Sequence, residues 1–111
     1  MPELELAREK CVVCKPGTPS LAANEIAALQ LEIDPAWAVV EARRLHRRWR
    51  FHDFASAFEF TSQLAQISEG QGHHPDIKLG WGYVEVDLET HAAHGLTRND
   101  FVMAARFDGI A

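Results

Sequence analysis

The chain of 111 residues lacks any stretch that approaches the roughly 20 consecutive apolar residues of a membrane-spanning helix. It also lacks the basic start and apolar core that are typical of a secretory signal. Met1-Pro2-Glu3 instead opens an acidic, polar tail. These absences argue against a membrane protein or a secreted protein, and we expect a cytoplasmic location.

Positive charge is also scarce, because 11 lysines and arginines stand against 16 aspartates and glutamates, for a formal net charge of −5. This balance argues against general affinity for nucleic acid. One basic patch could attract nucleic acid or an acidic partner. Charged strand faces are common and no aromatic interleaving supports nucleic acid, so we favour a solvated strand face or a subunit-contact surface. The patch consists of Arg43, Arg44, Arg47, Arg48 and Arg50.

The sequence has only two cysteines, Cys11 and Cys14, which form a C-x-x-C motif. In a reducing cytoplasm such a pair points to metal binding or redox activity before it points to a structural disulfide. A complete zinc site needs about four ligands, and no second C-x-x-C motif is present. No βαβ pattern surrounds the pair, so a thioredoxin-like role is poorly supported. We therefore expect thiols without a required role, with zinc binding or redox function as the alternative.

Composition predicts one compact domain, because 47% of the residues are hydrophobic and 24% are charged. Residues 1–17, which end at the break Pro16-Gly17, are predicted to be irregular. Residues 18–111 are predicted to form the domain.

Hydrophobic periodicity and capping residues predict seven elements in this domain. Thr18 and Asp53 are expected to cap the first two helices, and Thr97-x-x-Asp100 has the spacing of a capping box. The runs 44–51 and 83–89 alternate with period two, as half-buried strands do. The predicted elements are helix 19–31, strand 37–41, strand 44–51, helix 53–68, strand 76–79, strand 83–89 and helix 101–107.

The resulting order is α-β-β-α-β-β-α. Two hairpins that alternate with helices predict an α+β fold, with a four-stranded antiparallel sheet and three helices on one face. Aromatic residues of the long helix, including Phe54 and Phe58, are assigned to the core. Gly70-Gln71-Gly72 is expected to be a flexible link after this helix.

Four of the six histidines lie close together in the sequence, at His73, His74, His91 and His94. Any one of them alone would be expected to be a surface or core histidine. Their clustering between glycines favours a site for proton transfer, metal binding or a pH switch. Because His74 precedes Pro75, its backbone is biased to an extended form, in which neighbouring side chains point to opposite sides. His73 and His74 therefore cannot easily bind one metal, and the third ligand for a pair of His91 and His94 is uncertain.

The spacing of these residues resembles the signature of the pterin-4a-carbinolamine dehydratases, as in bacterial-type members of that family. The resemblance extends from about Pro35 to Phe107. The family has four strands and three helices, which agrees with the predicted order. The residues that carry the signature are Glu69, His73-His74-Pro75, Trp81, Thr90-His91 and Asp100, with Phe51-His52-Asp53-Phe54 before them and Gly95-Leu96-Thr97-Arg98-Asn99-Asp100-Phe101 after them.

The resemblance implies a hydro-lyase that converts 4a-hydroxytetrahydropterin to quinonoid dihydropterin and water, in tetrahydrobiopterin recycling beside phenylalanine hydroxylase. Loss of water needs an acid for the departing hydroxyl and a base for the proton on ring nitrogen N5, and imidazoles can serve as both without a metal or cofactor. The resemblance implies that His73, His74 and His91 are catalytic. We expect His74 and His91 to carry the proton transfers and His73 to bind and orient the pterin. His94 is not at a signature position.

Five further residues are candidates for substrate binding, each with a structural alternative. Glu69 could tether or polarise a histidine or be a surface carboxylate at a helix end. Asp100 is expected to cap the last helix rather than touch substrate, and Pro75 to fix the shape of the His-His segment. Trp81 could pack under the pterin ring, but we favour a core position. Thr90 could offer its hydroxyl to the polar edge of the pterin or end its strand.

The sequence leaves two other functions open. One is a protein-binding, dimerisation or assembly module of the same fold, which would predict loss of one or more of His73, His74 and His91. The other is a small zinc protein that uses Cys11 and Cys14. Because family members are dimers or tetramers, we expect a homodimer or homotetramer, with no nucleic-acid or membrane partner.

Overall fold

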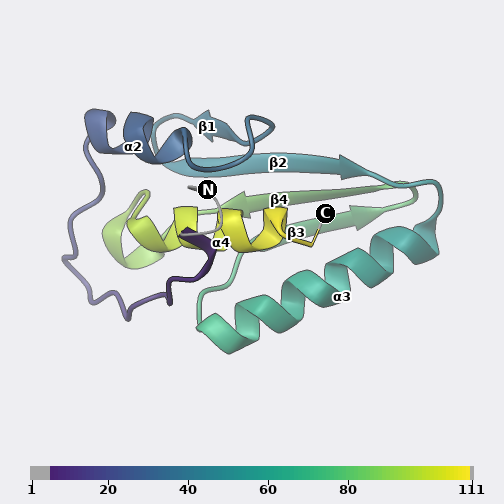
Figure 1. Ribbon diagram of the computed structural model, residues 1–111. Coiled ribbons are helices and arrows are strands. Elements are labelled where there is room, and N and C mark those ends of the chain that lie inside the picture. Colours follow the sequence, from purple (N-terminus) through teal and green to yellow (C-terminus); the bar gives the residue numbers. More distant parts are fainter. Residues whose placement is uncertain (1–5, 111) are drawn as a thin grey trace.

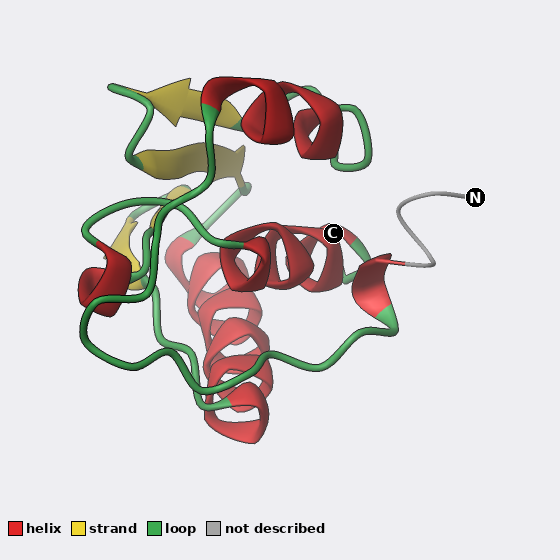
Figure 2. Ribbon diagram, turned by 90° about the vertical axis from the view of Figure 1, so that its left-hand side faces the viewer, coloured by secondary structure: helices red, strands yellow, loops and turns green. Residues whose placement is uncertain are grey.

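A computed structural model describes residues 6–110 and contains one four-stranded antiparallel sheet in the order β1-β2-β4-β3. Helices α2, α3 and α4 lie on one side of this sheet (Figures 1 and 2). The predicted α+β class and element order are confirmed. The elements are α2 (Ala23–Gln30), β1 (Ala38–Val40), β2 (Arg44–Arg50), α3 (Phe54–Gln71), β3 (Asp76–Gly80), β4 (Tyr83–Leu88), the 3-10 turn η1 (His91–Ala93) and α4 (Arg98–Asp108).

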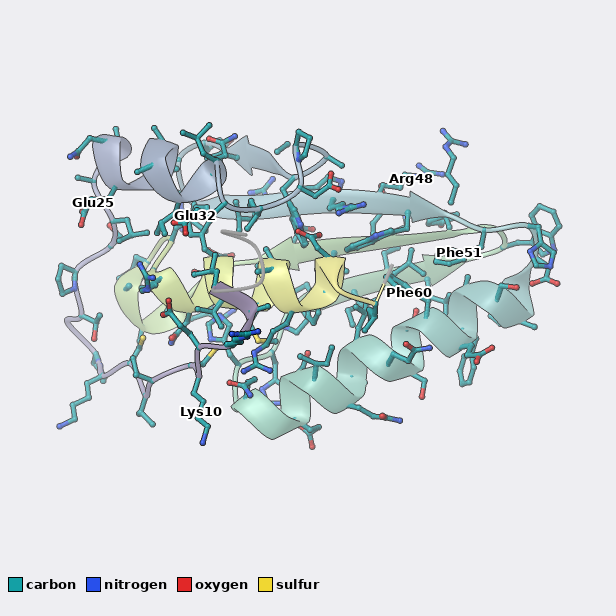
Figure 3. The ribbon with its side chains drawn as sticks, viewed as in Figure 1. Lys10, Glu25, Glu32, Arg48, Phe51 and Phe60 are labelled. Atoms are coloured by element: carbon teal, nitrogen blue, oxygen red, sulfur yellow. The ribbon has the colours of Figure 1, made fainter. Side chains whose placement is uncertain are left out.

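Strict alternation along β2 and β4 separates the two faces of the sheet. Leu45 pairs with Leu88 and Trp49 with Val84, and these apolar side chains are buried under the helices. Arg48 points away from the helices (Figure 3) and lies 3.8 Å from Glu85 on the neighbouring strand. Most of the basic patch therefore lies on a solvated strand face that carries its own acidic partners.

The N-terminus of α3 forms as predicted, because the Asp53 carboxylate accepts a hydrogen bond of 2.8 Å from the backbone N–H of Ser56. Phe60 packs between the sheet and the helix, 5.1 Å from the ring of Phe51 (Figure 3). The assignment of Phe54 and Phe58 to the core is wrong, since both side chains are exposed. The helix instead buries the stripe Ala57, Phe60, Leu64 and Ser68.

Several helix boundaries differ from the predicted ones, and α4 begins at Arg98 rather than residue 101 because Thr97 is its N-cap. Helix α2 begins at Ala23 rather than residue 19, because the backbone N–H of Leu21 donates to the carbonyl of Leu96 at 2.8 Å and holds this segment outside the helix. Helix α3 continues through Gly70 to Gln71, so the predicted flexible link is wrong for those two residues. Only Gly72 lies outside the helix, as its left-handed C-cap with φ of 65°.

The described part of the N-terminal segment, residues 6–17, is irregular apart from a helical turn at Leu6-Ala7. The side chain of Leu6 is fully buried in the core, which anchors the segment to the domain. The acidic start Met1-Pro2-Glu3 lies outside the described residues. No helix among residues 6–110 has the length and apolar character that a membrane span requires.

Candidate active site

The end of α3 delivers the two adjacent histidines. Gly72 turns the chain in the left-handed conformation, and the backbone N–H of His73 donates to the carbonyl of Ser68 at 3.3 Å. Pro75 then leads into β3, which begins at Asp76. His73 and His74 are therefore held between a helix cap and a strand rather than on a flexible loop.

A fully buried carboxylate, that of Asp100, orients His73. One oxygen of Asp100 lies 2.7 Å from His73 Nε2, and the other accepts from the Thr90 hydroxyl at 2.8 Å and from the Thr97 backbone N–H at 2.9 Å. A carboxylate accepts all three of these bonds, so the Nε2–H of His73 donates and a neutral ring carries its lone pair on Nδ1. Asp100 caps α4, as predicted, and also fixes the ring of His73.

The second histidine has a carboxylate partner as well, because Glu69 of α3 contacts His74 Nε2. Both side chains are exposed, so this pair adds little to stability. Its effect is on the orientation of the His74 ring. The structure thus supports the tethering role for Glu69 over an unpartnered surface carboxylate.

The third histidine, His91, comes from the segment that follows β4. His91 opens η1 directly after Thr90, whose backbone pairs with Gly95. The hydroxyl of Thr90 is buried and bonded to Thr97 and Asp100, so it helps to hold the carboxylate that contacts His73. Within residues 6–110, the ring of His91 has no carboxylate partner.

A cavity of about 330 Å³ joins these segments. This volume is in the usual range of about 300–1,000 Å³ for small-molecule sites. The cavity brings together the three histidines that were predicted to be catalytic. Its lining consists of Val12, Val13, Cys14, Gly72, His73, His74, Glu89, Thr90, His91, Ala92 and Asn99.

Of the five other predicted site residues, Thr90 lines this cavity, whereas Glu69, Pro75, Trp81 and Asp100 do not. Glu69 and Asp100 act through histidines, and Pro75 follows His74 in the chain. Trp81 lies in the β3–β4 turn and is 72% exposed, so its assignment to the core is wrong. Trp81 and Thr90 flank opposite ends of β4, which has six residues and is therefore about 20 Å long.

Sequence reasoning missed one wall of the cavity, which is formed by Val12, Val13 and Cys14. Burial raises the pKa of Cys11 to about 11, so its thiol stays protonated at neutral pH and is a poor nucleophile or metal ligand. Within residues 6–110, no group of three or more histidine, cysteine or acidic side chains is arranged to hold a metal ion. No signal in the sequence links this segment to the histidines.

Comparison with known proteins places this arrangement in a family. The family model described as pterin 4 alpha carbinolamine dehydratase matches residues 19–110. The chain belongs to this family. A dehydratase that removes water from a pterin is a hydro-lyase, and the match confirms the predicted enzyme class.

Relatives from two bacteria carry the name of a pterin-4-alpha-carbinolamine dehydratase. The protein of Rubrobacter xylanophilus is 43% identical over 94% of this chain and 96% of its own length. The protein of Gloeobacter violaceus is 45% identical over 97% of this chain and 95% of its own length.

Two solved structures share the fold. A transcriptional coactivator/pterin dehydratase from Brucella melitensis has a TM-score of 0.77 and 33% identity, covering 83% of this chain and 98% of that protein. A pterin dehydratase-like protein that is a RuBisCO assembly factor in the alpha-carboxysome has a TM-score of 0.59 and 29% identity, covering 68% of this chain and 89% of that protein.

Proposed function

We propose that this chain dehydrates 4a-hydroxytetrahydropterin to quinonoid dihydropterin. The observation that carries the proposal is the convergence of three imidazoles, those of His73, His74 and His91, on one cavity of small-molecule size. The histidines also differ in their environments. His73 is mostly buried on Asp100, whereas His74 and His91 are exposed at the cavity.

In the proposed reaction the bond between C4a and its hydroxyl oxygen breaks while a double bond forms between C4a and N5. The oxygen takes a proton from an acid and leaves as water, and the proton on N5 passes to a base. His74 and His91 perform these two transfers. His73, whose ring is fixed by Asp100, binds and orients the pterin. The balance of atoms requires no oxidant, reductant or metal.

The substrate is formed when an aromatic amino acid hydroxylase oxidises a tetrahydropterin. The proposal therefore places the chain in tetrahydrobiopterin recycling beside phenylalanine hydroxylase, acting as a homodimer or homotetramer. Sedimentation of the purified chain tests the oligomeric state, and a single species with the mass of one chain would contradict it.

The test is the decay of hydroxylase-generated 4a-hydroxytetrahydropterin, followed by ultraviolet absorbance with a chelator present. We expect the native protein to accelerate decay and His74→Ala and His91→Ala each to lower kcat by about 10²–10⁴-fold, the usual contribution of a general acid or base. His52→Ala is the matched control, because His52 is exposed before α3 and does not line the cavity. An unchanged spontaneous rate with the native protein would refute the proposal.

The assembly-factor relative favours a second candidate function, that of a protein-binding module. Three exposed aromatic residues, Phe54, Phe58 and Trp81, could contact a partner. The retention of all three site histidines favours the enzyme. A native protein without dehydratase activity would direct attention to these aromatic residues.

A further inference from the structure

Residues 12–14 of the N-terminal segment form one wall of the cavity. The family match begins at residue 19 and therefore does not include this wall. The N-terminal segment runs past the end of α3 and the start of α4 (Figure 2). The backbone N–H of Cys11 donates to the side-chain oxygen of Gln71 at 3.0 Å. The segment is thus attached to the same helix end that delivers His73.

A buried amide, that of Asn99, holds the segment at the cavity. Its Oδ1 accepts from the backbone N–H of Val12 at 2.9 Å, and its Nδ2 donates to the carbonyl of the same residue at 2.6 Å. The Asn99 amide thus bonds to both the N–H and the carbonyl of Val12, as a residue on a neighbouring antiparallel strand does. Nδ2 also lies 3.4 Å from Cys14 Sγ. Asn99 therefore fixes both ends of the three-residue wall.

The first turn of α4 aligns this wall with the histidines. Asn99 and Asp100 are consecutive and both are buried. Asn99 holds Val12, while Asp100 holds His73. The distance between the two walls is therefore set by one rigid helix turn, as a site that orients a flat substrate requires.

Val13 is 91% exposed although it is a branched apolar residue beside a cavity that contains three histidines. Its side chain has no place in the core. A flat heteroaromatic ring that enters the cavity would cover Val13 and remove apolar surface from water.

We infer that residues 12–14 form a substrate-holding wall for the pterin ring, and that Asn99 is the positioning residue that clamps it. The inference rests on the proposed function and adds to it the surface opposite the histidines. Because Leu6 is buried in the core, deletion of the N-terminal segment would damage the fold, and point variants are the appropriate test.

The decisive variant is Val13→Ser, which changes an exposed side chain and leaves the core intact. We expect KM to rise about fivefold to tenfold, from the loss of apolar contact, while kcat stays within about twofold of the native value. The matched control is Leu31→Ser, because Leu31 is 84% exposed and does not line the cavity. The control should keep the native KM.

Asn99→Ala tests the clamp. We expect KM to rise at least as much as in Val13→Ser, and hydrogen exchange at the Val12 amide to become faster because its acceptor is removed. If both variants keep the native KM in an active enzyme, the inference is wrong and the proposed function stands.

If the native chain is inactive, binding of biopterin measured by calorimetry decides the role of the wall. Weaker binding by Val13→Ser than by the native chain would support the wall while the proposed function fails. Equal binding by the two chains would overturn the inference. A native chain that neither reacts with the substrate nor binds biopterin would overturn both proposals.

Discussion

At the residue scale, the Asp100 carboxylate accepts from the backbone N–H of Thr97 at the start of α4 and also contacts His73 Nε2. Its position in the capping-box spacing was readable from the sequence, and the structure confirms the cap. Its bond to His73 was not readable, because that residue is 27 positions away and the contact exists only once α4 packs beside the end of α3. Local patterns predict caps, whereas the orientation of the His73 ring depends on tertiary contacts.

The substitution Asp100→Asn should damage activity and stability together. An amide oxygen can accept only part of what the carboxylate accepts, and its NH₂ group would face the donors at His73, Thr90 or Thr97. We expect kcat to fall about 10–100-fold, as for other residues that orient a functional group. The free energy of unfolding should fall by about 1–3 kcal/mol. Dehydratase kinetics and denaturant unfolding measure the two effects.

The matched control for this variant is Asp76→Asn, because Asp76 is exposed on β3 and points to the outer face of the sheet. It removes the same charge and should leave both quantities unchanged. A native kcat in Asp100→Asn would show that the carboxylate is not needed to orient His73.

At the element scale, the end of α3 allows two glycines to be compared. Gly70 lies within the helix with open space around its Cα, whereas Gly72 has φ of 65° at the C-cap. We expect Gly70→Ala to raise the free energy of unfolding by about 0.5–1 kcal/mol, because alanine favours a helix and restricts the unfolded chain. Gly72→Ala should lower it by about 1–2 kcal/mol, because a Cβ strains the left-handed conformation. Equal effects in thermal unfolding would contradict this assignment.

The other end of α3 predicts a pH effect. The backbone N–H of Ser56 lowers the pKa of Asp53 by its hydrogen bond to the carboxylate. A lowered pKa in the folded state means stabilisation that is present above the ordinary aspartate pKa and is lost as pH falls through the lowered value. Asp53→Asn should therefore melt below the native protein at pH 7, and the difference should shrink as the pH falls below the ordinary aspartate pKa of about 3.9. A constant difference in melting temperature across this range would refute the charge effect.

The elements predicted best from the sequence are the strands, in which buried and exposed side chains alternate with a period of two. Val84, Val86 and Leu88 are all buried, as the alternation of β4 required. The start of α2 was placed wrongly because the backbone of Leu21 bonds to Leu96, a partner that no local pattern specifies. Phe58 was misplaced because it lies about 100° around the helix from the buried Ala57, so apolar character alone did not define the inner face.

At the scale of the whole molecule, the sequence predicted which histidines meet but not what faces them. The family signature lies within one stretch, so its residues could be recognised together. The opposite wall comes from Val12, whose partner Asn99 is 87 positions away. Such a contact depends on how the N-terminal segment crosses the ends of two helices.

A second long-range contact joins the C-terminus of α4 to the sheet. Asp108 accepts hydrogen bonds from the backbone N–H of Asp34, from Trp37 Nε1 and from Arg47, at 3.0, 2.8 and 2.6 Å. Burial raises the pKa of Asp108, against the lowering influence of these donors. One carboxylate thus fixes the start of β1, the inner face of β2 and the last turn of α4.

This geometry predicts an asymmetry between the two partners of the ion pair, whose side chains are each only 12% exposed. Asp108→Ala leaves three donors without their acceptor and should lower the free energy of unfolding by about 3 kcal/mol. Arg47→Met keeps an apolar side chain of similar length over Trp49 and leaves Asp108 with two donors, so it should cost less than half as much. Urea unfolding of the native chain and both variants measures the difference. Equal losses would show that the charge pair, rather than the set of bonds to Asp108, holds α4 to the sheet.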